Sequence, residues 1–103
     1  MTITETTYGR VQRDTAHGAT TVSGTHEQLA GWAHNPYASW PCSALRHYDR
    51  VVATFIDGDL VELAVTQDGA DVEALELGGD ELTAWASECL IRAGYPNHPA
   101  VRA

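Results

Sequence analysis

Hydrophobic residues recur in the second half of the chain as two strand-like runs. VVATFI, residues 51–56, is β-branched and aromatic, and LVELAVT, residues 60–66, follows directly after Asp57-Gly58. Asp-Gly is the dipeptide that a two-residue type I′ hairpin favours. A slightly longer turn at residues 67–69 precedes DVEALEL, residues 71–77, which is a third strand. The pattern predicts an antiparallel meander at the centre of the protein.

A short helix is predicted before this meander. Thr25 and Gln28 have the spacing of a capping box, in which each side chain satisfies a backbone amide at the helix start. Apolar residues then recur at helical spacing, at Leu29, Trp32 and Ala33. Asn35-Pro36 is a helix stop signal, so we expect the helix to end there.

A second helix is predicted after Gly78-Gly79. Asp80 and Glu81 fall in its first turn, where carboxylates oppose the positive end of the helix dipole. Its apolar residues form one stripe for packing on the sheet: Leu82, Trp85, Ala86, Cys89, Leu90 and Ala93. Gly94 then ends the helix.

These elements predict a small α+β fold of order helix, strand, strand, strand, helix. We expect a three-stranded antiparallel sheet with both helices packed on one face. Residues 1–24, rich in Thr and Gly, are expected to be a mobile arm, which could add one short edge strand as a fourth. Residues 25–94 form the single α+β domain and residues 95–103 a C-terminal tail. Because VVATFI is apolar on both sides, the second face is either partly covered by the arm and the loop before the meander or buried in a homodimer, which we favour.

The order of elements from Thr25 to Ala93 resembles that of double-stranded-RNA-binding domains. The resemblance is one of topology and implies a possible fold. Such domains grip phosphate with a basic cluster at the start of the last helix, whereas this position reads Gly79-Asp80-Glu81 here. We therefore expect no direct contact with nucleic acid.

The composition indicates a soluble protein. The chain has 103 residues, of which 44% are apolar, and a formal net charge of −8 from 14 acids and 6 arginines. No apolar run approaches the roughly 18 residues of a membrane span, and the two cysteines form no disulfide pattern. We expect a cytoplasmic, reducing environment and no membrane partner. The absence of lysine and the abundance of Ala, Asp, Gly, Val and Thr are typical of GC-rich genomes, such as those of actinobacteria and their phages.

The acidic residues are segregated, since no basic residue occurs between Arg50 and Arg92. The segment contains Asp57, Asp59, Glu62, Asp68, Asp71, Glu73, Glu76, Asp80, Glu81 and Glu88. A surface of one sign steers a partner of the opposite sign, although solvation alone would also tolerate these charges. The leading hypothesis is a non-enzymatic binding or regulatory protein that engages a basic partner protein. A phage or accessory-element inhibitor would suit this role, with a nucleic-acid mimic as the extreme case.

Aromatic residues in a proline-bounded loop could anchor such a partner, and Tyr37 and Trp40 are the candidates. The alternative is a small enzyme or ligand-binding subunit with a pocket around Cys42, His47 and Trp40, in which Asp49 would orient the imidazole. No elbow, oxyanion loop or phosphate cradle accompanies these residues, and the histidines lack the close pairs of a zinc site. We expect no cofactor and no metal.

Overall fold

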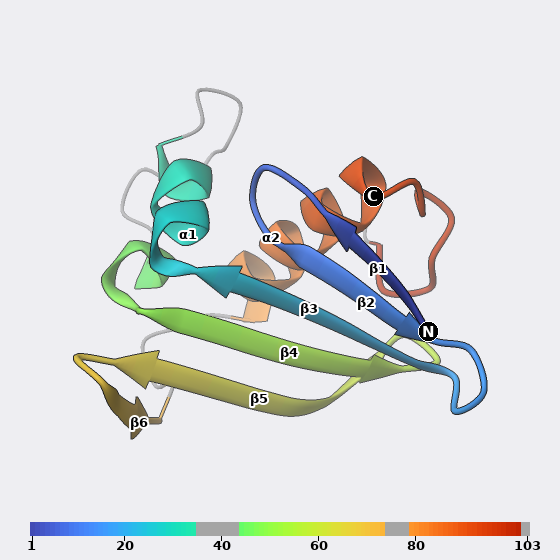
Figure 1. Ribbon diagram of the computed structural model, residues 1–103, viewed down its shortest axis with the longest axis horizontal. Helices are drawn as coiled ribbons and strands as arrows, with labels where there is room; N and C mark the ends of the chain where they lie inside the picture. Colours follow the sequence, from blue (N-terminus) through green and yellow to red (C-terminus); the bar gives the residue numbers. More distant parts are fainter. Residues whose placement is uncertain (35–43, 74–78, 102–103) are drawn as a thin grey trace.

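In a computed structural model, described for residues 1–34, 44–73 and 79–101, the chain forms one antiparallel sheet of six strands and two α-helices (Figure 1). The strands are β1 (Thr2–Glu5), β2 (Arg10–Asp14), β3 (Ala19–Thr25), β4 (Arg50–Ile56), β5 (Asp59–Gln67) and β6 (Ala70–Val72). The helices are α1 (His26–Ala33), a short 3₁₀ helix η1 (Ala44–His47) and α2 (Gly79–Arg92). Each strand pairs with the next along the chain, so the sheet order is β1-β2-β3-β4-β5-β6.

The expected count of three or four strands is wrong. Residues 1–24, in which at most one edge strand was expected, contain β1, β2 and nearly all of β3, and β3 pairs with β4 along its whole length. The hydrophobic pattern does not predict β3, because the inward positions of this strand are Thr20, Val22 and Gly24, of which only Val22 is a large hydrophobe. Half-buried strands usually alternate apolar and polar residues, and this strand does not.

The predicted order is nevertheless present as α1, β4, β5, β6, α2. What differs is that β3 continues the sheet beyond β4, and β2 and β1 follow on the same side. Only β4, β5 and β6, half of this sheet, therefore correspond to the three-stranded sheet of double-stranded-RNA-binding domains. The likeness in topology does not extend to the N-terminal strands.

Both hairpins of the meander have turns that depend on positive φ angles. Asp57 and Gly58 have φ of 52° and 87°, as the predicted type I′ turn requires, and the turn joins β4 to β5. Asp68 and Gly69, at 53° and 79°, make the second turn, which is as tight as the first. The β4–β5 register shifts between Thr54 and Phe55, leaving Val61 as a bulge residue.

The bulge changes which side chains of β5 share a face. Phe55 is paired with Leu60, but Thr54 is paired with Glu62, so the extra residue restores Glu62 to the outer face. Leu63 and Val65 then return to the inner face opposite Ala53 and Val51. The bulge thus keeps the carboxylate in solvent while the apolar residues point to the core.

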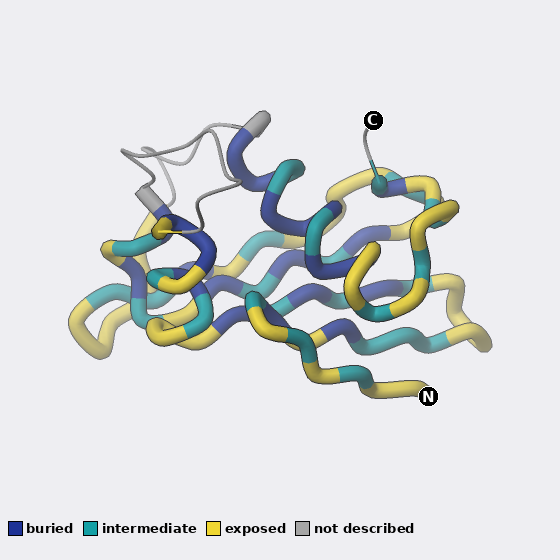
Figure 2. The backbone as a smooth tube through the Cα atoms, turned by 90° about the horizontal axis from the view of Figure 1, so that it is seen from above, coloured by how far each residue is buried: buried dark blue, intermediate teal, exposed yellow. Residues whose placement is uncertain are grey.

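The core lies between the inner face of the sheet and the helices, on one side of the molecule (Figure 2). The predicted stripe of α2 is confirmed, because Leu82, Trp85, Ala86, Cys89 and Leu90 are buried. The Trp85 indole N–H donates to the Tyr8 carbonyl at 2.9 Å, which ties α2 to the β1–β2 turn. A Cβ placed on Gly24 would lie 2.9 Å from both Leu29 of α1 and Trp85 of α2. Both helices therefore pack against the inner face of β3.

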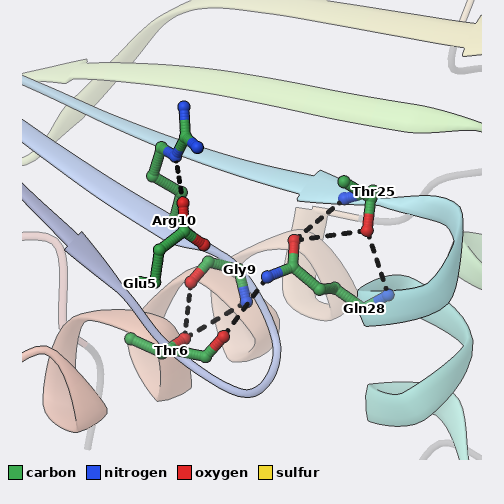
Figure 3. A network of polar contacts seen from close by, with 6 residues as sticks. All are labelled: Glu5, Thr6, Gly9, Arg10, Thr25 and Gln28. Atoms are coloured by element: carbon green, nitrogen blue, oxygen red, sulfur yellow. Dashed lines mark hydrogen bonds and ion pairs between the residues drawn. The ribbon is translucent and has the colours of Figure 1, made fainter.

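The start of α1 has the predicted capping box (Figure 3). The Gln28 amide N–H donates to Thr25 Oγ1 at 3.3 Å, and the Thr25 amide donates to Gln28 Oε1 at 3.1 Å. The Gln28 side chain also donates to the Thr6 carbonyl at 3.2 Å, so the cap is joined to the β1–β2 turn. The helix ends with His34 as its C-cap, and the predicted stop at Asn35-Pro36 lies outside the described residues.

The outer face of the sheet faces away from the helices (Figure 2). VVATFI divides as its alternation requires: Val51, Ala53 and Phe55 are buried, whereas Ile56 is 40% exposed on the outer side. Val52 and Thr54 are half-buried there by their neighbours on β3 and β5. The N-terminal segment adds strands beside VVATFI and does not cover this face. The homodimer stays a prediction.

Candidate functional site

Six of the predicted acidic residues lie together along one edge of the sheet, which we call the acidic edge. It consists of Asp57, Asp59, Glu62, Asp68, Asp71 and Glu73. These residues belong to β5, β6, their two turns and the residue after β6, and all six are exposed. Asp57 and Asp68 flank the nine-residue strand β5, so the acidic edge is about 30 Å long. It is a ribbon of charge rather than a pocket.

No carboxylate of the acidic edge has an ion-pair partner in the described part of the chain. In the sheet, Glu62 is opposite Thr54, Asp59 is opposite Ile56, and Asp71 is opposite Thr66. Two unit charges about 10 Å apart in water repel by about 0.4 kcal/mol. The fold tolerates this row of like charges, and the field that they produce is left for solvent or a partner.

The remaining acidic candidates lie elsewhere or are not described. Glu81 is 8% exposed, and its carboxylate accepts the Leu45 amide N–H at 3.3 Å. Glu88 lies on α2 and pairs with Arg92 at 2.7 Å. Glu76 lies outside the described residues, as does the side chain of Asp80. Glu81 and Glu88 are therefore structural groups of α2 and do not extend the acidic edge.

The arginines of the N-terminal segment do not reach the acidic edge. Arg10 extends from β2 and pairs with Glu5 on β1 (Figure 3). Arg13 stacks on Tyr95, with its guanidinium carbon 4.8 Å from the ring centroid. Arg50 is opposite Thr66 on β5, and Thr66 is opposite Asp71, so Arg50 lies two strands from that carboxylate.

A polar hollow of about 540 Å³ lies on the outer face where β3 leads into α1. Arg10 and Arg50 line it together with three acids, Glu5, Glu27 and Asp49. Arg10 already has Glu5 as its partner, and a carboxylate oxygen of Asp49 accepts the Gly69 amide N–H at 2.8 Å. With three carboxylates against two guanidiniums, the hollow has no excess of positive charge for an anion. The sequence does not predict this hollow because its walls come from four separate stretches of the chain.

The proposed anchors Tyr37 and Trp40 lie outside the described residues, as does Cys42 of the alternative pocket. His47 is exposed at the end of η1, and its carbonyl accepts the side-chain amide of Gln67 at 3.2 Å. Cys89 is fully buried, and burial raises the pKa of its thiol to about 12, so it is a core residue and no nucleophile. Within residues 1–34, 44–73 and 79–101 no group of three or more His, Cys, Asp or Glu side chains could hold a metal ion.

Comparison with known proteins identifies no relative: no family model, no curated protein and no solved structure matches the chain. None of the helices formed by the described residues has the length and apolar character needed to cross a membrane.

Proposed function

We propose that this protein is a small non-enzymatic binding protein that engages a basic partner protein through the acidic edge. The observation that supports the proposal is the row of six exposed carboxylates without an ion-pair partner among the described residues. Three acids elsewhere in the described residues do have ion-pair partners: Glu5 with Arg10, Asp14 with His17 and Glu88 with Arg92. The acidic edge stands apart because six carboxylates without such a partner adjoin one another there.

The form of the acidic edge suits an extended basic segment or a basic face rather than a small ligand. Its charges are spread over about 30 Å on a strand and two turns, a length comparable to the width of a standard protein interface. Such an arrangement raises the association rate of a cationic partner and loses strength as salt screens it. An inhibitor that occupies the phosphate-binding surface of a nucleic-acid-binding protein would be the strongest form of this function.

The test uses a deca-arginine peptide as a defined cationic probe and calorimetry at several salt concentrations. Asp59→Asn/Glu62→Gln/Asp71→Asn neutralises three positions of the acidic edge. Glu5→Gln/Glu27→Gln/Glu88→Gln is the matched control, because it changes the net charge from −8 to −5 in the same way but lies elsewhere. With exposed pairs worth about 0.2–1 kcal/mol each, the three changes together should weaken binding of the first variant about 3- to 150-fold.

Equal losses in the two variants would show that the probe responds only to net charge, and the acidic edge would have no special role. If the predicted difference appears, affinity capture from a lysate at low and high salt identifies partners, with the first variant as the negative control. A homodimer through the outer face would compete with this function, because Glu62 of the acidic edge points to that face. A doubled mass by light scattering would support that dimer.

A further inference from the structure

Arg13 is a partly buried cation for which the residues that the structure describes supply no anion. It lies on β2 opposite Thr20 and points to the inner face, on the side of the helices. Its Nε is shielded from solvent and has no hydrogen-bond acceptor. None of its five N–H donors is paired with any part of the chain that the structure describes. A desolvated donor without an acceptor carries a free-energy penalty, which is larger for a charged group.

A second arginine shows what the fold does elsewhere. Arg92 stacks on Tyr8 at 4.7 Å, nearly the same geometry as Arg13 on Tyr95 at 4.8 Å. Arg92 is more exposed, yet Glu88 holds its Nε at 2.7 Å. The more exposed Arg92 therefore has a carboxylate partner, whereas the less exposed Arg13 has none among the described residues.

A cavity of about 310 Å³ opens beside Arg13, and its other walls are residues 94–99. No carboxylate is among these residues, although the chain as a whole carries 14 acids. His98 is part of the wall: its Nδ1 accepts the Ala100 amide N–H at 3.0 Å, and its Nε2 lies 2.9 Å from Thr20 Oγ1. Both ring nitrogens are therefore occupied by the fold, and the imidazole supplies no counter-charge.

We propose that this cavity, formed by Arg13 and residues 94–99, is a binding site for a small monocarboxylate with an apolar body. The carboxylate pairs with the guanidinium, whose planar fork of donors matches two carboxylate oxygens. The apolar body lies against Tyr95, Pro96 and Pro99, which line the same cavity. The site shares no residue with the acidic edge, although Pro99 lies against Gly58 of the β4–β5 turn, and the proposal stands independently of the function proposed for that edge.

The charge and size of the cavity define the ligand class. The single positive charge of Arg13 is balanced by a ligand with one negative charge. A dianion such as phosphate would be repelled more strongly by the protein, whose net charge is −8. The volume is at the lower end of small-molecule sites, which favours a ligand about the size of an aromatic or branched-chain acid. The Arg13 charge is delocalised over the guanidinium, so an anion at its terminal nitrogens also stabilises the enclosed Nε.

The test is titration of the ¹⁵N-labelled full chain with benzoate, followed by NMR of the amides of residues 94–99 and of the Arg13 side-chain N–H. Benzamide is the neutral probe of the same shape, and inorganic phosphate is the dianionic one. Arg13→Gln removes the charge, Arg13→Lys keeps the charge without the fork, and Arg92→Gln is the matched control at the other arginine–tyrosine stack. Circular dichroism establishes that each variant is folded.

Benzoate should shift these resonances, and its affinity should be at least about tenfold higher than that of benzamide, since a charge-assisted pair accounts for a difference of that size. Arg13→Gln should lose a similar factor, Arg13→Lys a smaller one, and Arg92→Gln none. The proposal fails if benzamide binds as well as benzoate, if Arg92→Gln weakens binding as much as Arg13→Gln, or if phosphate binds more tightly. Absence of shifts up to about 50 mM benzoate would also overturn it, because a guanidinium–carboxylate pair with apolar contacts should bind more tightly than that.

Discussion

The packing of β3 against both helices makes a prediction in which one substitution has opposite effects at two positions. Gly24 lies on the inner face of β3, and Gly31 lies on the exposed side of α1. A Cβ on Gly24 would be 2.9 Å from Leu29 Cδ2 and 2.9 Å from Trp85 Cζ2, whereas one on Gly31 would meet Tyr8 no closer than 3.9 Å. Gly24→Ala should destabilise the protein, and Gly31→Ala should stabilise it.

The magnitudes follow from these distances. Carbon atoms in contact normally lie about 3.5–4.0 Å apart, so Leu29 and Trp85 would each have to move by about 0.6 Å or more. Both side chains are fully buried, and overpacking of this kind costs about 1–3 kcal/mol. A lower entropy of the unfolded chain returns about 0.4–1 kcal/mol, so at the middle of both ranges the free energy of unfolding of Gly24→Ala should fall by about 1.3 kcal/mol. Gly31→Ala should gain about 0.5–1 kcal/mol from helix propensity alone.

The assay is urea denaturation of the two variants and the parent at one pH, followed by thermal unfolding. The m-values should be equal, and the melting temperatures of the two variants should differ by about 10 °C or more in a domain of this size. A Gly24→Ala protein as stable as the parent would refute the close approach of β3, α1 and α2. That approach is the basis of the whole arrangement of the core.

Two further predictions concern the capping box and His98. Thr25→Ala removes the side-chain acceptor of the Gln28 amide and should lower the free energy of unfolding by about 1 kcal/mol, measured by urea denaturation. Burial and then the charge of Arg13 lower the pKa of His98 below its ordinary 6.5, so as the pH falls the unfolded chain takes up this proton first. Stability should therefore decrease as the pH falls below about 6.5, and His98→Gln should show a smaller decrease in urea midpoints over the same range; an unchanged pH dependence in the variant would contradict this.

Some elements of this fold are encoded within a few residues, and the sequence alone predicts them. Asp57-Gly58 defines a hairpin because both residues tolerate the positive φ angles of a type I′ turn. Thr25 and Gln28 begin α1 because each satisfies a backbone group of the other, and the stripe of α2 predicts its buried face. In each case the interactions are local, so no knowledge of the rest of the chain is needed.

The acidic edge is an intermediate case. The absence of cations between Arg50 and Arg92 indicates a region of one sign. The sequence could not show that Glu81 is buried against Leu45, because that contact joins residues 36 positions apart. Nor could it show the bulge at Val61 that restores Glu62 to the outer face, because register also depends on the partner strand.

Only the tertiary structure decided the N-terminal half of the sheet and the Arg13 cavity. β3 has Thr20 and Gly24 at inward positions, and these are acceptable only because His98 bonds to the threonine and because Leu29 and Trp85 fill the space over the glycine. Arg13 and Tyr95 meet across 82 positions of the sequence, where β2 lies beside the segment after α2. The local pattern of polar residues in these strands predicts a loop or an arm. Only long-range packing makes these residues part of the core.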